Sequence, residues 1–146
     1  VLWTLQAYAL GNPTVRIRVT HQHSTANELL FQTSGKYDDP LGVATSLFGP
    51  VATQGMIHLE DELFDLYCST PTAGGGRSAA DRQFCFCNGR PCTLPTLTKH
   101  LNGLYREHGI DRYPFLILCL HLDPSQIDVN VTPDKRTIFL QPEKLL

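Results

Sequence analysis

Residues 115–120 form a continuous run of six apolar residues, Phe-Leu-Ile-Leu-Cys-Leu. A strand with one solvent-exposed face alternates apolar and polar residues, so an unbroken apolar run of this length predicts a central strand that is covered on both faces. Residues 83–87 form a second segment that is apolar on both faces. The two segments therefore predict two buried strands of one sheet.

The segment between these strands has the pattern of a turn followed by a helix. Asn-Gly-Arg-Pro at 88–91 reverses the chain, and Thr93 is the predicted N-cap of a helix with Pro95 in its first turn. The apolar stripe of this helix consists of Leu94, Leu97, Leu101, Leu104, Tyr105 and His108. A strand-helix-strand unit is therefore predicted over 83–120.

The N-terminal third predicts two helices and a hairpin. Apolar residues at helical spacing in 1–10 end at Gly-Asn-Pro, and Asp39 can cap a second helix that begins at Pro40 and ends at Gly-Pro 49–50. Alternation in 15–20 predicts a strand with Val15, Ile17 and Val19 on its buried face, paired with 29–33.

Further strands are predicted around Ile57, at 64–67, and at 128–131 and 136–140, with a glycine-rich loop at 70–80. The pattern as a whole indicates an α+β fold, a mixed β-sheet packed with helices. With 146 residues and 42% hydrophobic content, the chain can bury one ordinary core, so a single domain over residues 1–146 is expected.

The charge balance argues against a dedicated nucleic-acid-binding domain. Twelve Lys and Arg against 14 Asp and Glu give a net charge of −2, whereas such domains usually carry a basic excess. Any DNA contact must come from a local patch. The longest apolar run, 114–122, is too short for a membrane-spanning helix, which needs roughly 20 residues.

Five cysteines, an odd number, form no paired framework and favour a reducing compartment. Cys85, Cys87 and Cys92 invite a zinc interpretation, but a structural site usually needs four ligands and no fourth is evident. Buried cysteines acting as small hydrophobes are the preferred interpretation, and no metal site is predicted. The six histidines show no spacing that defines a catalytic set.

Four motifs carry a family resemblance: Asp-Arg-Gln-Phe at 81–84, Asn-Gly-Arg-Pro at 88–91, Arg-Tyr-Pro at 112–114, and Asp-Val-Asn-Val-Thr-Pro-Asp-Lys at 128–135. In this order they resemble the MutL family of DNA mismatch repair ATPases, and the Thr-Pro-Asp-Lys form is similar to the eukaryotic PMS branch. The resemblance implies a transducer domain that follows an upstream nucleotide-binding domain, which these residues do not contain. It also implies a ribosomal-protein-like fold with a left-handed βαβ crossover, an exception to the usual handedness.

Lys135 matches the family lysine that reaches the terminal phosphate of ATP, held with Mg²⁺ mainly by the neighbouring domain. The resemblance implies that Lys135 is the catalytic residue and contacts the cofactor. Without the resemblance, the local sequence would indicate a solvated lysine in a loop. The isolated chain is expected to hold no cofactor and to show no turnover.

Arg90 corresponds to a family arginine implicated in DNA binding, and Arg77 and Arg82 could join it in a patch that contacts phosphates without reading bases. The resemblance further implies double-stranded DNA, mismatch-recognition proteins and a second MutL homologue in a heterodimer as partners, in the nucleus. Two alternatives stay open. One is a DNA-binding module that uses the arginine patch without ATP coupling, and the other is the transducer of another ATPase of the same superfamily.

Overall fold

The computed structural model describes residues 1–24, 26–71, 76–128 and 139–140. The chain divides into two compact units, Val1–Gln54 and Gly55–Leu146, and each is described by itself. The single domain over residues 1–146 stays a prediction.

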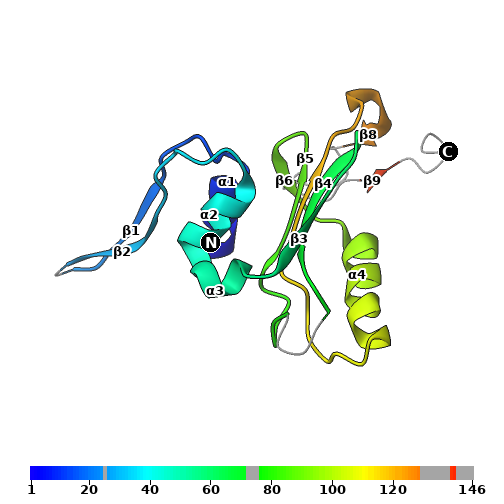
Figure 1. The fold of residues 1–146 in the computed structure, drawn as a ribbon. Coiled ribbons are helices and arrows are strands. Elements are labelled where there is room, and N and C mark those ends of the chain that lie inside the picture. Colours follow the sequence, from blue (N-terminus) through cyan, green and yellow to red (C-terminus); the bar gives the residue numbers. More distant parts are fainter. Residues whose placement is uncertain (25, 72–75, 129–138, 141–146) are drawn as a thin grey trace. The chain divides into compact units, whose positions relative to one another are not determined.

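The first unit contains three helices and a hairpin (Figure 1): α1 Leu2–Leu10, β1 Arg18–Gln22, β2 Asn27–Gln32, α2 Pro40–Phe48 and α3 Pro50–Thr53. The predicted cap of α2 is confirmed, because the Asp39 carboxylate accepts a hydrogen bond from the Gly42 backbone N–H at 2.8 Å. Proline at the first helical position fixes φ and needs no hydrogen-bond partner there. The predicted first helix and the hairpin are likewise confirmed.

The buried face predicted for the first strand is wrong at its start. The strand begins at Arg18 instead of Val15, and Val15 is 48% exposed, while Ile17 and Val19 are half-buried. The β1–β2 pair forms a sheet of two strands, and within the part of the chain that the structure describes no further strand pairs with either edge. Alternation in the sequence marks one face of a strand as more apolar, but burial requires a second layer over that face.

The second unit is built on a five-stranded sheet of order β3-β4-β7-β5-β6. Its strands are β3 Met56–Glu60, β4 Phe64–Ser69, β5 Gln83–Cys87, β6 Arg90–Cys92 and β7 Leu116–Leu120. The β5–β7 pair is parallel and the other pairs are antiparallel, so the sheet is mixed, as predicted. A short pair, β8 Ile127–Asp128 and β9 Phe139–Leu140, follows the 3₁₀ turn η1 Pro124–Gln126.

The predicted strand-helix-strand unit is confirmed as β5, α4 Pro95–Glu107 and β7, with β7 at the centre of the sheet (Figure 1). One face of the sheet packs with the start of α4 in a core of Cys85, Cys87, Cys92, Leu94, Leu116, Leu118 and Leu122. Alternate residues Phe84, Phe86 and Ile117 on the opposite face are at most 1% exposed. Both strands are therefore covered on two faces, as their sequences predicted. The left-handed crossover stays a prediction.

Two details of α4 were predicted wrongly. Leu94, and not Thr93, is the N-cap. A leucine side chain has no hydrogen-bond acceptor, so it cannot cap the helix, and it packs instead in the core, at 6% exposed. Leu97 and Leu104 are 38% and 48% exposed, whereas Tyr105 is buried. A helix lying on a sheet buries a narrow strip, and the predicted stripe was wider than the contact.

Candidate functional site

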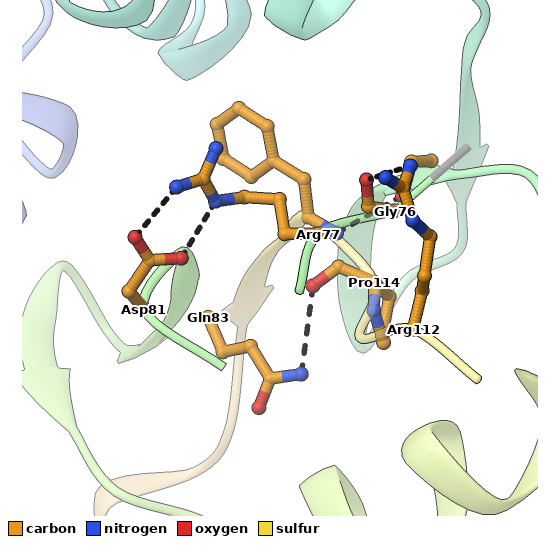
Figure 2. Close-up of polar contacts among 8 residues, drawn as sticks. Gly76, Arg77, Asp81, Gln83, Arg112 and Pro114 are labelled. Atoms are coloured by element: carbon orange, nitrogen blue, oxygen red, sulfur yellow. Dashed lines mark hydrogen bonds and ion pairs between the residues drawn. The ribbon is translucent and has the colours of Figure 1, made fainter. Parts of the chain in front are cut away.

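Arg77 is held in an ion pair with Asp81. Its Nε and Nη2 atoms donate to the two carboxylate oxygens at 2.6 and 2.8 Å, a bidentate geometry (Figure 2). The hydrogen bonds raise the pKa of Arg77 and lower the pKa of Asp81. Reciprocal backbone hydrogen bonds to Tyr113, at 2.7 and 2.8 Å, fix the backbone of Arg77. A phosphate would therefore have to share this guanidinium with Asp81 or displace the carboxylate.

Gly76, which precedes this arginine, occupies a position that a side chain would not fit. Its φ is +74°, and a Cβ atom would lie 2.7 Å from Tyr105 Cε1 and 2.8 Å from the Tyr113 carbonyl oxygen. The Gly76 carbonyl accepts a hydrogen bond from Arg112 at 3.3 Å (Figure 2). The backbone conformation and the close contacts at position 76 therefore require glycine there.

Arg82 packs against an aromatic ring. Its guanidinium carbon lies 5.7 Å from the centroid of Phe115, within the range of a cation–π contact. Burial lowers the pKa of Arg82, and the nearby charge of Arg77 acts in the same direction. Arg77 and Arg82 thus lie close enough for their charges to interact.

Arg90 is exposed and is the first residue of β6. It follows a tight turn in which Asn88 and Gly89 have φ values of +48° and +78°, as expected of a two-residue hairpin connection. The Asn88 side chain donates to the Leu122 carbonyl at 2.8 Å and accepts from the Leu122 N–H at 3.0 Å. These contacts fix the backbone that presents Arg90 to solvent.

The three arginines occupy two separate places. Arg82 immediately precedes β5, and Arg90 pairs with Cys87 at the other end of that strand. At about 3.3 Å per residue, the five steps from Arg82 to Cys87 separate the two backbones by roughly 17 Å. Arg77 and Arg82 therefore lie near one end of β5 and Arg90 lies near the other. Their role in DNA binding stays a prediction.

Lys135 lies outside the described residues. The strands β8 and β9 on either side of residues 129–138 pair antiparallel, with Ile127 opposite Leu140 and Asp128 opposite Phe139. The prediction that two strands flank the Thr-Pro-Asp-Lys segment is confirmed for residues 127–128 and 139–140.

The chain matches the protein family described as "DNA mismatch repair protein, C-terminal domain" over residues 44–146. The chain belongs to this MutL mismatch repair family. It is 31% identical over 140 residues to "DNA mismatch repair protein pms1" of Schizosaccharomyces pombe, covering 95% of this chain and 18% of that protein. It is 49% identical over 80 residues to "Mismatch repair endonuclease PMS2" of Mus musculus, covering 55% of this chain and 9% of that protein.

A solved structure of the N-terminal domain of a DNA repair protein also resembles the chain, with a TM-score of 0.83 and 31% sequence identity. The match covers 97% of this chain and 47% of that one. The chain thus spans less than a fifth of the two curated relatives and about half of the structural relative. Among the described residues of this family member, no helix is both long and apolar enough to cross a membrane.

The prediction that Cys85, Cys87 and Cys92 are buried small hydrophobes is confirmed. Cys85, Cys87 and Cys92 are each 3% exposed and belong to the core beneath α4. Burial raises the pKa of Cys85 and of Cys92 to about 12, so both thiols stay protonated at neutral pH.

A polar cluster on the five-stranded sheet was not predicted from the sequence. Asp65 accepts hydrogen bonds from His58 Nε2 at 3.3 Å and from His121 Nε2 at 3.0 Å. The hydrogen bond from His121 makes the largest contribution to lowering the pKa of Asp65. The sequence places His58 and Glu60 two residues apart on a strand, which is the part of the cluster that could have been found from the sequence. Asp65 and His121 join the cluster only through the pairing of strands in the sheet.

Proposed function

We propose that this chain is a transducer domain that couples ATP binding in an adjacent domain to domain closure, dimerisation and engagement of DNA. The observation that carries the proposal is the family membership together with the structural match over 97% of the chain. The Thr-Pro-Asp-Lys segment then lies between two strands that pair with each other, β8 and β9.

In the proposed mechanism, Lys135 contacts the terminal phosphate of Mg-ATP held by the adjacent domain. A lysine is a compact charge on a flexible stem, suited to reach across a domain boundary. A charge-assisted hydrogen bond of this kind contributes about 1.5–3 kcal/mol. If the contact forms with the triphosphate alone, it stabilises the closed arrangement by that amount and converts nucleotide state into conformation.

The test is the steady-state ATPase rate of the chain joined to its nucleotide-binding domain, with Lys135 intact and as Lys135→Ala. A fall of about tenfold or more is expected, where tenfold is equivalent to about 1.4 kcal/mol. Lys99→Ala is the matched control, because Lys99 is an exposed lysine on α4. Equal rates and equal nucleotide affinities for the two variants and the parent protein would contradict the mechanism.

DNA engagement is assigned to Arg90, which is exposed at the start of β6 on an anchored turn. A guanidinium that contacts phosphates displaces counterions, so the affinity falls steeply with salt. Arg90→Glu should therefore weaken binding of a DNA duplex and reduce its salt dependence. Arg106→Glu, at an exposed arginine in the last turn of α4, has the same change of charge and is the control.

The proposed setting is a nuclear heterodimer with a second MutL homologue that acts with mismatch-recognition proteins. The eukaryotic PMS relatives support this setting, and the chain spans a small part of their length. Co-purification of the full-length protein with a second MutL homologue from nuclei would test it. Recovery of a homodimer alone would contradict the heterodimer.

A DNA-binding module without ATP coupling is the second candidate, and the exposure of Arg90 favours it. The two candidates differ in one outcome. The transducer requires that ATP change the affinity for the duplex and that Lys135→Ala abolish this change. In the simple module, the affinity depends on Arg90 and is the same with and without nucleotide.

A further inference from the structure

Three neighbouring strands bring four potential metal ligands to one surface of the second unit. His58 and Glu60 are two residues apart on β3, so their side chains share a face of the sheet. Asp65 of β4 is the direct register partner of Glu60. On the other side of β4 from β3, Asp65 pairs with Cys119 of β7, and His121 lies two residues after Cys119.

The distances within this group suit a small cation. The nearest ligand atoms of His58, Glu60 and Asp65 all lie within 4.8 Å of one another, and His58 Nε2 is 3.3 Å from Asp65 Oδ1. A tetrahedral ion with bonds of about 2.0–2.1 Å holds its ligand atoms about 3.3 Å apart. The histidine and the aspartate already have this separation, and Glu60 is exposed and can rotate toward them.

The charge around this surface favours a cation independently of the distances. Glu60 and Asp65 are like charges directly opposite each other in an antiparallel pair, an arrangement that destabilises a sheet. Residues 55–71 contain four carboxylates and no Lys or Arg. A divalent ion between Glu60 and Asp65 would remove the repulsion and connect the edge strand β3 to β4.

Contacts around the group already orient two of the ligands. His121 donates from Nε2 to Asp65 Oδ2 at 3.0 Å, and its backbone N–H donates to the Leu63 carbonyl at 2.8 Å. The His58 ring stacks on Tyr67, with centroids 4.1 Å apart and planes at 4°. Carboxylates that bind metals usually accept a further hydrogen bond on the second oxygen, which is the contact that His121 makes.

We propose that His58, Glu60 and Asp65 bind a divalent first-row transition-metal ion such as Zn²⁺, with a water molecule as the fourth ligand. His121 is a positioning residue that orients Asp65. An imidazole with two carboxylates supplies the nitrogen and oxygen donors that such ions accept. The site goes beyond the proposed transducer function, and its ion would stabilise β3 at the edge of the sheet.

A second group in the chain, His21, His23 and Glu28, also brings three ligand atoms within 4.8 Å of one another. All three residues are exposed and lie on the β1–β2 hairpin. This group is the appropriate comparison, because it offers the same donor types on a different unit of the chain.

The test is titration of the 146-residue chain with Zn²⁺ by calorimetry, together with the melting temperature with and without the ion. Binding of Zn²⁺ and a rise in melting temperature are expected, and Glu60→Gln should weaken the affinity at the sheet site at least tenfold. Without metal, Glu60→Gln should melt at a higher temperature than the parent chain, because it removes the repulsion with Asp65. A loss of binding in this variant therefore cannot be ascribed to unfolding.

Asp65→Asn should also lose the site, and His121→Gln should weaken it about tenfold, as expected when an orienting contact is removed. The double variant His21→Ala/His23→Ala is the control and should keep the sheet site. Equal affinity of Glu60→Gln and the parent chain would overturn the proposal. Loss of all binding in the hairpin variant would also overturn it, since the ion would then belong to the hairpin.

Discussion

The side chain of Asn88 and the backbone of Leu122 exchange two hydrogen bonds, at 2.8 and 3.0 Å, in the manner of paired strands. The Asn88 backbone N–H also donates to the Leu120 carbonyl at 2.9 Å. The turn that carries Arg90 is thereby attached to the end of β7, the central strand. This attachment gives the Asn-Gly-Arg-Pro motif a structural role in addition to the proposed DNA contact.

Asn88→Ala should destabilise the chain by about 2–3 kcal/mol, because two hydrogen bonds are lost and alanine is strained at a φ of +48°. Chemical denaturation measures the loss. Asn88→Gly separates the two causes, because it keeps the backbone conformation and loses the same bonds, and it should cost less. An equal loss for both variants would show that backbone strain contributes nothing.

Gly76→Ala should destabilise the chain by about 2 kcal/mol or more, because the added Cβ would lie within 3.0 Å of Tyr105 and Tyr113 at a positive φ. Gly103→Ala is the matched substitution. It lies within α4 with nothing within 4 Å of its Cβ, so it should stabilise by about 0.5–1 kcal/mol. Thermal melting of the two variants should therefore give shifts of opposite sign, and shifts of the same sign would contradict this account.

Alkaline pH should destabilise the chain in reducing buffer. Burial raises the pKa of Cys85 and Cys92 to about 12 from an ordinary value of 9.0, so the native state retains protons that the unfolded state releases. Stability is complete below about pH 9 and falls as pH rises above it, by roughly 1.4 kcal/mol per pH unit for each such thiol. Denaturation midpoints at pH 8 and pH 10 measure the effect, and Cys85→Ala should reduce the slope. A slope unchanged in Cys85→Ala would contradict the assignment.

Asp81→Asn should release Arg77 from its bidentate pair and remove one negative charge beside Arg82. If Arg77 contacts DNA, the affinity for a duplex should rise about threefold or more at low salt. Stability should change by less than about 1 kcal/mol, since the pair is partly exposed. Asp111→Asn at an exposed aspartate is the control for net charge. Equal increases in the two variants would exclude a specific role for Arg77.

Local sequence patterns were sufficient to predict the central elements of the fold. The unbroken apolar runs identified β5 and β7 as buried strands, and Asp39 before Pro40 identified the start of α2. The order of the motifs identified the MutL family, which the comparisons confirm. These features are local in sequence, and the physical effects behind them, two-sided burial and helix capping, act over a few residues.

Which polar groups contact each other depends on the tertiary structure. It separated Arg90 from Arg77 and Arg82 along the length of β5, and it brought His121 to Asp65, which is 56 residues away. It also left Val15 and Leu97 exposed, although both fit an apolar pattern. Periodicity shows which face of an element is apolar, but the order of strands in a sheet and the layer over each face depend on contacts between distant segments. That dependence is why the sequence could not predict the histidine and carboxylate cluster.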